Sequence, residues 1–344
     1  MFAGLPGRPA TWARPTPPAQ VPSERKLEGQ MDAQMDGQLQ GPQDGQVVTG
    51  RYRGALGERA WRLYIPAGYN RARPPMLLVL LHGCTQNADD LARGSQMDRV
   101  ADERGFLVLY PEQSVQANPR TCWNWFDAAH QSRDAGETGL LAALIAEVMS
   151  QYPVDTKRVH LAGISAGAAM AGLVAVAYPE RFASLTSASG VAWRSATTVG
   201  AALAVMQRGA GEKLATAQDV VGAMGATRRA LPVLVVHGTR DAVVSPANAD
   251  ETTQQWIGVH QLLRASAGLP ALKSAADESE TVNGYAVRTS RWREPSGTVL
   301  IEQVRIEGLG HAWSGGSTAG TFSDAQGPDA SRMIAAFCAL HRLP

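Results

Sequence analysis

Short runs of apolar residues recur along the chain and predict strands that are buried on both faces of a sheet. Residues 76–81 read Met-Leu-Leu-Val-Leu-Leu, residues 231–236 are similarly apolar, and a His-Gly pair follows each run. A continuous apolar run of this length is typical of a strand in a parallel sheet covered by helices on both sides. Further strand-like segments are 61–65, 106–110, 159–162, 183–188, 285–292 and 298–306. The last two predict a hairpin.

Helices are predicted between these strands. Apolar positions within 140–148 have the spacing of one helix face, and residues 96–103 and 330–340 also have helix-like patterns. Strands that alternate with helices predict an α/β fold with a mostly parallel, doubly wound sheet and helices on both faces. Residues 194–229 are alanine-rich pieces broken by glycines, and we expect them to form a small lid or insertion over the site.

Composition and charge narrow the class of protein. The 344 residues are 44% hydrophobic and 18% charged, which suits one large α/β domain or two modest ones. A net charge of +1 gives no reason to expect binding to nucleic acid or to an anionic membrane surface. The longest aliphatic run, 76–81, is far too short to span a bilayer.

The N-terminal part of the chain differs from the rest. Residues 1–46 hold several prolines, followed by a mixture of Gln, Gly, Met and Asp. Because this composition cannot bury a core, we expect a disordered arm over 1–46 and a catalytic domain over 47–344. The arm lacks the apolar stretch of about 7–15 residues that a secretory signal needs.

The residues Gly-Ile-Ser-Ala-Gly at 163–167 match the pattern G-x-S-x-G. A strand-like segment precedes them, and a run of small, helix-forming residues follows. A serine on such a sharp strand-to-helix turn presents its hydroxyl to a histidine. Glycines are needed beside it because side chains there would collide across the turn. Ser165 is therefore predicted to be a nucleophile rather than an ordinary surface serine.

A serine hydroxyl needs a base to accept its proton and an acid to orient that base. In α/β hydrolases these residues occur in the order Ser, Asp or Glu, His. Among seven histidines, His311 fits best because it lies late in the chain, in a Gly-Leu-Gly-His loop. Asp241 follows the predicted strand 231–236 and its His-Gly pair, so we expect it to be the acid. Asp250 and Glu251, in the helix-like segment that comes next, are the fallback choices.

The tetrahedral intermediate of acyl transfer needs N–H donors for its oxyanion. We expect these donors to be the backbone N–H of Ala166, directly after the nucleophile, and that of Cys84, after the run 76–81. Cys338 lies in a helical pattern that predicts a buried thiol. The residue pattern leaves open whether Cys84 and Cys122 are two free thiols or one disulfide.

With these parts in place, the chain resembles the polyhydroxybutyrate (PHB) depolymerase-type esterases of the α/β-hydrolase superfamily. The resemblance covers roughly residues 50–340. It is carried by Leu-His-Gly-Cys-Thr-Gln at 81–86, Tyr-Pro-Glu-Gln at 110–113, Cys-Trp-Asn-Trp-Phe at 122–126, the turn at 163–167, His-Gly-Thr-Arg-Asp at 237–241 and Gly-Leu-Gly-His-Ala-Trp-Ser-Gly-Gly at 308–316.

This resemblance implies an α/β-hydrolase fold and a serine esterase that cleaves poly- or oligo-(3-hydroxybutyrate) and similar short acyl esters. It implies a triad of Ser165, Asp241 and His311. It also suggests a disulfide between Cys84 and Cys122, which would tie the oxyanion loop to the tryptophan loop. Family members are commonly secreted, so an extracellular location is implied. A cytoplasmic location is the alternative, because no export signal is visible.

Trp123, Trp125 and Trp313 are the aromatic residues nearest the inferred site. Flat aromatic walls suit an apolar hydroxyacyl chain, so we expect these side chains to bind substrate. Core packing is the competing interpretation for each of them.

Other functions fit the same residues. One is a feruloyl or acetyl esterase acting on polysaccharide esters, since the residues of a triad do not determine which acyl group is bound. Another is an acyltransferase, and a third is a non-catalytic binding protein, against which the complete triad argues. The sequence has no metal-ligand or phosphate-loop motif, so we expect no metal and no cofactor. The expected partner is a polyester or oligoester substrate, with no nucleic acid and no membrane.

Overall fold

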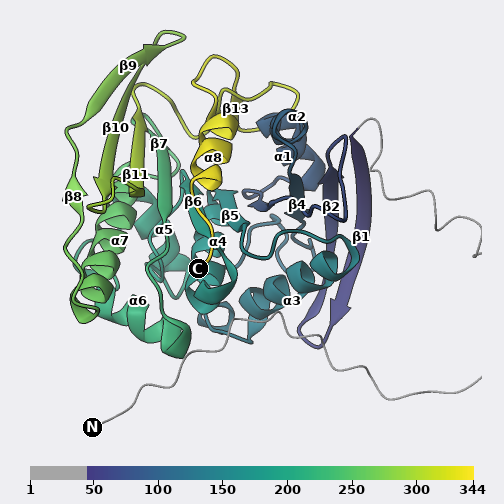
Figure 1. The fold of residues 1–344 in the computed structure, drawn as a ribbon, viewed down its shortest axis with the longest axis horizontal. Helices are drawn as coiled ribbons and strands as arrows, with labels where there is room; N and C mark the ends of the chain where they lie inside the picture. Colours follow the sequence, from purple (N-terminus) through teal and green to yellow (C-terminus); the bar gives the residue numbers. More distant parts are fainter. Residues whose placement is uncertain (1–44) are drawn as a thin grey trace, which may run out of the picture.

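The computed structural model describes residues 45–344, so residues 1–44 of the expected arm lie outside the described residues. Within 45–344 the chain forms an eleven-stranded sheet flanked by helices, and a small two-stranded sheet (Figure 1). The strands of the large sheet are β1 (Gln46–Gly54), β2 (Gly57–Ile65), β3 (Leu77–Leu81), β4 (Leu107–Pro111), β5 (Val159–Ile164), β6 (Ser184–Ala188), β7 (Val233–Gly238), β8 (Lys273–Ser274), β9 (Glu278–Val282), β10 (Tyr285–Arg293) and β11 (Val299–Ile306). The helices are α1 (Ala88–Ser95), α2 (Met97–Arg104), α3 (Gly136–Gln151), α4 (Ala166–Ala177), α5 (Val199–Arg208), α6 (Ala217–Met224), α7 (Ala247–Ser266) and α8 (Ala330–Ala339). The small sheet pairs β12 (Trp313–Ser314) with β13 (Ser323–Asp324).

The large sheet has a parallel centre and antiparallel edges. Its strand order is β1-β2-β4-β3-β5-β6-β7-β11-β10-β8, with β9 paired to β10. Strands β4, β3, β5, β6, β7 and β11 are parallel neighbours. The β1–β2 hairpin extends one edge, and the predicted hairpin of β10 and β11 extends the other.

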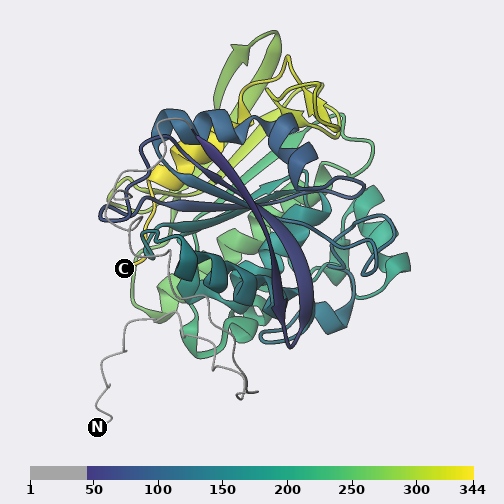
Figure 2. The same cartoon turned by 90° about the vertical axis from the view of Figure 1, so that its right-hand side faces the viewer.

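The apolar runs fill two separate cores because successive side chains of a strand point to opposite faces. In β3, Leu77, Val79 and Leu81 pack into the core on the α3 and α4 side. Leu78 and Leu80 pack into the core on the α1, α2 and α8 side. Figure 2 shows this layering: α1, α2 and α8 (blue and yellow) lie on one side of the twisted sheet, and the teal helices lie on the other.

Strand β1 is an element that the sequence pattern did not predict. Its residues are mostly exposed or half-buried, so the apolar alternation that identifies a strand is weak. Pairing with β2 over its full length stabilises it as an edge strand. Its first residue, Gln46, lies within the range 1–46 of the expected N-terminal arm.

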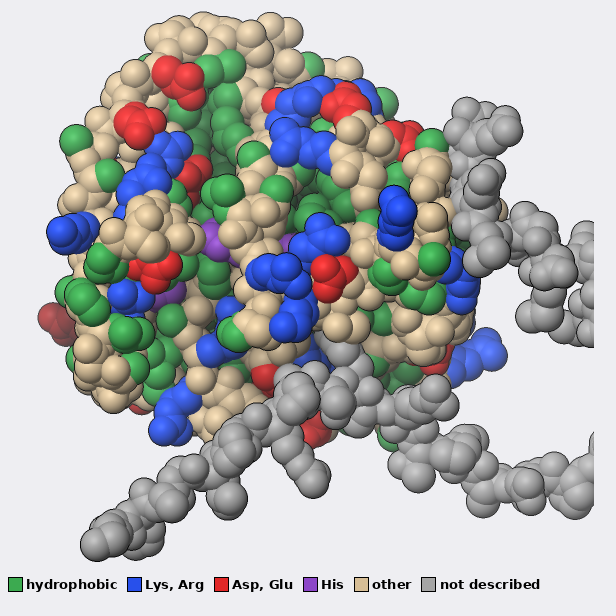
Figure 3. Space-filling view, viewed as in Figure 1, with side chains coloured by type: hydrophobic (Ala, Val, Ile, Leu, Met, Phe, Trp, Pro, Cys, Tyr) green, Lys and Arg blue, Asp and Glu red, His purple; other side chains and the backbone are tan. Residues whose placement is uncertain are grey.

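The loops that carry the expected chemistry meet at one edge of the sheet. Parallel strands place their carboxyl ends together, and ligands of open α/β sheets bind outside those ends. Strand β3 leads into the loop of Cys84, β5 into Ser165, β7 into Asp241 and β11 into the loop of His311. Figure 3 shows basic, acidic and hydrophobic side chains side by side on one face of the molecule.

Candidate active site

Ser165 lies on a strained turn between β5 and α4. Its backbone has φ 56° and ψ −122°, a combination that L-residues rarely adopt. The Ser165 N–H donates to the carbonyl of Ala188, 2.9 Å away, which anchors the turn to the end of β6. The strain is held by the surrounding sheet, and it turns the hydroxyl away from the backbone.

The two glycines beside Ser165 allow the turn to pack closely against its neighbours. A Cβ on Gly163 would lie 2.4 Å from the carbonyl carbon of Gly167. A Cβ on Gly167 would lie 2.2 Å from the carbonyl oxygen of Leu81, at the end of β3. Both neighbours are backbone atoms, so neither can move aside cheaply. Glycine at these positions is therefore a packing requirement.

Asp241 and His311, which are 70 positions apart in the chain, meet in a direct hydrogen bond. His311 Nδ1 lies 2.7 Å from Asp241 Oδ2. The other carboxylate oxygen, Oδ1, accepts the backbone N–H groups of Val243 and Val244 at 2.9 and 2.8 Å. These two bonds close the turn after β7 and fix the carboxylate, so that it faces the imidazole.

Burial by itself would raise the pKa of Asp241, but the hydrogen bonds from His237 and His311 outweigh it and hold the pKa well below its usual range. Asp241 is therefore ionised at neutral pH. An ionised carboxylate can only accept hydrogen bonds, so His311 Nδ1 carries a proton and Nε2 is left with the lone pair. This is the tautomer that a general base needs.

His237 is a second histidine on the same carboxylate, and the sequence pattern gave it no role. Its Nε2 lies 3.3 Å from Asp241 Oδ2 and 2.9 Å from the carbonyl of Val244. Both partners are acceptors, so Nε2 must carry the proton. The histidine four residues before the acid, at the end of β7, is the signal that could have indicated this contact.

The two fallback acids have partners of their own. Asp250 accepts hydrogen bonds from Gln303 (2.8 Å) and Arg305. Glu251 accepts the N–H groups of Ala210 and Gly211, both at 2.8 Å. Neither contacts the His311 ring among the described residues.

The loop after β3 is linked to the tryptophan loop by a disulfide between Cys84 and Cys122, whose Cα atoms are 4.1 Å apart. The neighbouring amides are engaged: Gly83 N–H donates to Gln86 Oε1 (3.0 Å), and Thr85 N–H donates to the carbonyl of Arg120 (2.7 Å). The expected oxyanion donors, Cys84 N–H and Ala166 N–H, make no hydrogen bond to another residue within 45–344.

Two buried polar groups that the sequence did not indicate support this loop. His82 donates from Nδ1 to the carbonyl of Gly83 (2.8 Å) and accepts the N–H of Gln113 at Nε2 (3.0 Å). Burial lowers the pKa of His82 to about 4, so its ring is neutral. Glu137, which is 1% exposed, accepts from Arg59 (3.0 Å) and from the N–H of Asn124 (2.7 Å). Both side chains fix the backbone of site-forming loops.

Ser165 and His311 open into one cavity of about 610 Å³ with mainly apolar walls. The two side chains are not hydrogen-bonded to each other among the described residues; such contacts often tighten only when substrate binds. The cavity is lined by Gly83, Cys84, Thr85, Gln86, Asn118, Arg120, Cys122, Trp125, Phe126, Ile164, Ser165, Val199, Ala202, Leu203, Met206, Val243, His311 and Phe322. Only α5 of the expected lid segment 194–229 borders it, because α6 packs against α4 and α7 instead.

Of the three tryptophans expected to form a substrate wall, Trp125 lines the cavity. The expectation is wrong for Trp123 and Trp313. Trp123 is fully buried beside the ring of His82, and Trp313 is buried with its indole N–H donating to Ser331 Oγ at 3.0 Å. Closeness in sequence to a site residue does not decide whether a side chain faces the cavity or the core.

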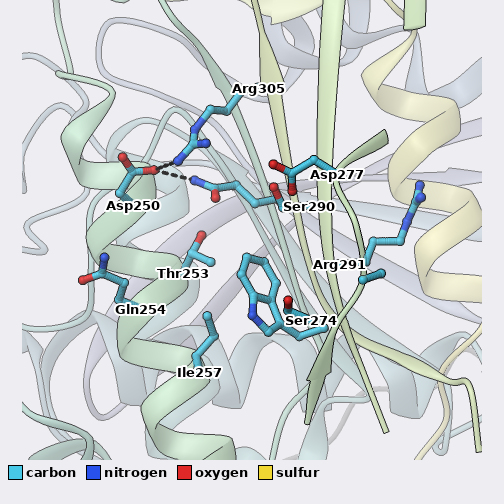
Figure 4. A pocket seen from close by; sticks show the side chains of 12 residues that line it. Asp250, Thr253, Gln254, Ile257, Ser274, Asp277, Ser290, Arg291 and Arg305 are labelled. Atoms are coloured by element: carbon cyan, nitrogen blue, oxygen red, sulfur yellow. Dashed lines mark hydrogen bonds and ion pairs between the residues drawn. The ribbon is translucent and has the colours of Figure 1, made fainter. Parts of the chain in front are cut away.

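A second hollow of about 320 Å³ lies between α7 and the strands β8, β10 and β11 (Figure 4). Its wall includes the Asp250 carboxylate, which accepts from Arg305, as a dashed line shows. Gln303 donates to the same carboxylate. Ser165 and His311 do not line it. This hollow therefore lies outside the candidate active site.

The part of the chain that the structure describes offers no group of three or more His, Cys, Asp or Glu side chains placed to hold a metal ion. Over the same residues, no helix has both the length and the apolar character that a membrane crossing requires.

Comparison with known proteins identifies relatives of this fold and site. A family model described as "Esterase PHB depolymerase" matches residues 59–282. Poly(3-hydroxyalkanoate) depolymerase C of Paucimonas lemoignei is 30% identical over 250 residues, which cover 72% of this chain and 57% of that protein. Acetylxylan esterase A of Talaromyces purpureogenus is 30% identical over 228 residues, covering 62% and 56%. The chain thus spans a little more than half the length of these two curated relatives.

Solved structures share the fold. An acetyl xylan esterase from Aspergillus awamori superposes with a TM-score of 0.64 at 20% sequence identity, over 85% of this chain and 99% of that one. An S-formylglutathione hydrolase from Agrobacterium tumefaciens superposes with a TM-score of 0.52 at 15% identity, over 89% and 98%. At these identities the likeness concerns the fold alone. The α/β-hydrolase fold expected from the sequence is confirmed.

Proposed function

The chain belongs to the Esterase PHB depolymerase family, and from this premise we propose that it is a serine esterase that hydrolyses poly- or oligo-(3-hydroxybutyrate) and similar short acyl esters. One observation carries the proposal. Ser165, on its strained turn, and His311, held by Asp241, open into the same largely apolar cavity. This is the arrangement that nucleophilic acyl transfer requires.

The reaction proceeds in two halves. As Ser165 Oγ attacks the ester carbonyl carbon, its proton passes to His311 Nε2, and Asp241 stabilises the resulting imidazolium. The tetrahedral oxyanion accepts hydrogen bonds from the N–H groups of Cys84 and Ala166. When the intermediate collapses, the ester C–O bond breaks, and the leaving alkoxide takes the proton from His311 Nε2. The product of this half is an acyl-Ser165 ester and a free alcohol.

The second half returns the enzyme to its starting state. His311 Nε2 accepts a proton from water, and the hydroxide equivalent attacks the acyl carbon. Collapse of this second intermediate breaks the bond to Ser165 Oγ, and Oγ regains its proton from His311. The acid released here and the alcohol released in the first half together contain the atoms and electrons that entered as ester and water.

The walls and rim of the cavity support an apolar acyl substrate. Trp125 and Phe126 line the cavity with rings in edge-to-face contact, 5.7 Å between centroids. Four lining residues are exposed hydrophobic side chains: Val199, Leu203, Val243 and Phe322. Exposed apolar groups gathered at one cavity mark a binding surface for apolar material.

Acetyl ester hydrolysis on polysaccharides is the second candidate. The observation that favours it is the Talaromyces purpureogenus relative, named an acetylxylan esterase, at the same 30% identity as the depolymerase. The proposed triad and oxyanion donors would serve both reactions equally, because they contact the ester group and not the chain beyond it.

A hydrolysis panel tests the proposal. It compares p-nitrophenyl acyl esters, hydroxybutyrate oligomers, amorphous polymer, methyl ferulate and acetylated xylan, with Ser165→Ala as the control. We expect cleavage of hydroxybutyrate oligomers and loss of at least about a thousandfold of the activity in Ser165→Ala. Preference for acetylated xylan or the ferulate would replace the substrate assignment, and full activity in Ser165→Ala would exclude the mechanism.

A further inference from the structure

The cavity at Ser165 contains one cationic side chain that the proposed mechanism does not use, that of Arg120. Among residues 45–344 its guanidinium has no hydrogen-bond, ion-pair or aromatic partner. Besides His311, no other lining residue is an acid or a base that ionises, since the two cysteines are joined in a disulfide. The cavity therefore has a positive charge that no carboxylate of the described chain neutralises.

The amide side chains that line the cavity are already engaged within the protein. Gln86 accepts from Gly83 N–H at Oε1 and donates from Nε2 to Asp90 Oδ2, both at 3.0 Å. Asn118 accepts from the N–H of Arg120 at Oδ1 and donates to Asn124, both at 2.9 Å. Neither amide has to bind substrate in order to be satisfied.

The hydroxyl of Thr85 is engaged as well, because it donates to the carbonyl of Cys84 at 2.6 Å. Apart from Ser165 and His311, the Arg120 guanidinium and the indole N–H of Trp125 are the polar side-chain groups of the lining that make no hydrogen bond among residues 45–344, and of these two only Arg120 is charged. The amide side chains of this cavity are hydrogen-bonded within the protein, and one cation is left unpaired. Such a cavity is suited to an apolar ligand with a single negative charge.

The backbone of Arg120 is fixed on both sides. Its N–H donates to Asn118 Oδ1 (2.9 Å), and its carbonyl accepts the N–H of Thr85 at 2.7 Å. Two residues further on, Cys122 is bonded to Cys84 of the oxyanion loop. The exposed arginine side chain therefore starts from a rigid base directly beside the expected oxyanion donors.

We propose that Arg120 binds the terminal carboxylate of a short hydroxyacid oligoester, which makes the enzyme selective for chain ends and soluble oligomers over the interior of a polymer. This inference rests on the proposed esterase function and names a substrate class for it. Every oligomer of a hydroxyacid ends in a carboxylate. The guanidinium is planar and permanently charged, and it offers paired N–H donors that match both carboxylate oxygens.

The first experiment compares a hydroxybutyrate trimer with its methyl ester, which keeps the ester bonds between the units, gains one at the methyl end and has no charge. Only cleavage between the units is counted for both compounds. We expect the wild-type kcat/KM to be about threefold to tenfold higher for the free acid, as for a partly exposed charge-assisted contact. The ratio should fall to about one in Arg120→Gln, persist in part in Arg120→Lys, and shrink in 0.5 M salt. Arg104→Gln, an exposed arginine of α2 outside the cavity, is the matched control and should leave the ratio unchanged.

A second measurement keeps this inference separate from the esterase function. In Ser165→Ala, the trimer acid should bind more tightly than its methyl ester by calorimetry, and the difference should vanish in Ser165→Ala/Arg120→Gln. If the wild type cleaves neither compound, the proposed function fails, and the binding data still decide the role of Arg120. The inference would be overturned if the wild-type kcat/KM were about the same for the trimer acid and its methyl ester. An equal loss of kcat/KM for both compounds in Arg120→Gln would also overturn it.

A carboxylate could also come from a uronic acid on an acetylated polysaccharide. The same variants are therefore compared on acetylated xylo-oligosaccharides with and without a glucuronic acid branch. We expect no dependence on Arg120 in this arm. A dependence confined to the branched sugar would overturn the choice of an oligoester end.

Discussion

At the scale of single residues, the site depends on one buried carboxylate that serves several partners. Asp241 accepts from two backbone N–H groups and from two histidine rings, His237 and His311. Burial raises the pKa of Asp241, whereas these hydrogen bonds lower it. The hydrogen bonds have the larger effect, so the pKa is below its usual range. The carboxylate thus stays ionised over the pH range in which a histidine base can work.

Replacing the carboxylate without changing its size tests this assignment. We expect Asp241→Asn to lower kcat by roughly 10³–10⁴-fold with little change in KM, because an amide favours the wrong histidine tautomer and does not stabilise the imidazolium. Steady-state kinetics on p-nitrophenyl butyrate measure the effect. Asp250→Asn is the matched control, since Asp250 pairs with Arg305 and Gln303 outside the cavity. A larger loss in Asp250→Asn would show that the acid is misassigned.

The scale of elements explains how sequence-distant residues come to lie together. The turn between β5 and α4 is packed against the end of β3, so Gly167 and Leu81 are in close contact although they are far apart in the chain. Helix α5 contributes Val199, Ala202, Leu203 and Met206 to the cavity wall. The β5–α4 turn and helix α5 thus pack against other elements and also contribute residues to the site.

Two glycines of α4 provide a comparison of packing requirements. In Gly167→Ala the new Cβ would lie 2.2 Å from the Leu81 carbonyl oxygen, whereas a Cβ at Gly172 would meet nothing within 4 Å. We expect Gly172→Ala to raise the free energy of unfolding by about 0.5–1 kcal/mol, because alanine is the better helix former. Gly167→Ala should lower it by several kcal/mol or prevent folding. Urea unfolding measures both, and equal stabilities would argue against the close contact.

Helix α5 offers a test of the apolar rim. Leu203 is 57% exposed and lines the cavity, while Leu269 is 52% exposed and lies outside it. We expect Leu203→Gln to raise KM for octanoyl or oligomeric esters by about fivefold, which corresponds to about 1 kcal/mol of lost apolar contact, and to leave acetyl esters unaffected. Leu269→Gln should change neither KM. If the two substitutions act alike, the rim does not contact substrate.

At the scale of the whole molecule, the fold buries neutral histidines that take no part in the proposed proton transfer. Burial lowers the pKa of His82, His260 and His341 to about 4, and that of His160 to about 3. In the unfolded chain a histidine titrates near pH 6.5. Below that pH the unfolded state therefore binds more protons than the folded state, and folding becomes less favourable.

The sign of this linkage gives a prediction for acid stability. The free energy of unfolding should be highest above about pH 6.5 and fall as the pH drops toward 4, by up to about 1.4 kcal/mol per pH unit for each buried histidine. Asp241 adds a loss below about pH 4, because its pKa is lower in the folded state than in the unfolded state. Urea unfolding at pH 7.5, 6 and 5 measures the slope, and His260→Gln should reduce it. An unchanged stability from pH 7.5 to 5 would contradict this account.

Much of the fold could be predicted from the sequence because the patterns involved are local. The continuous apolar runs identified β3 and β7, since a strand buried on both faces has no polar positions. The G-x-S-x-G pattern located the turn, since sterics at 163–167 depend on only a few neighbouring residues. Strand β1 was missed because an edge strand carries a weak apolar pattern and depends on pairing with β2.

What the sequence by itself determined is therefore the central parallel sheet, the strained turn of Ser165 and the order of the expected triad, because backbone periodicity and turn sterics are set by adjacent residues. Only the tertiary structure decided which polar and aromatic groups meet. It paired His311 and His237 with one carboxylate, placed Trp125 at the cavity and Trp313 in the core, and left the guanidinium of Arg120 without a partner among the described residues. The direction in which a packed side chain points depends on neighbours that are far apart in the chain. A local sequence pattern therefore does not predict it.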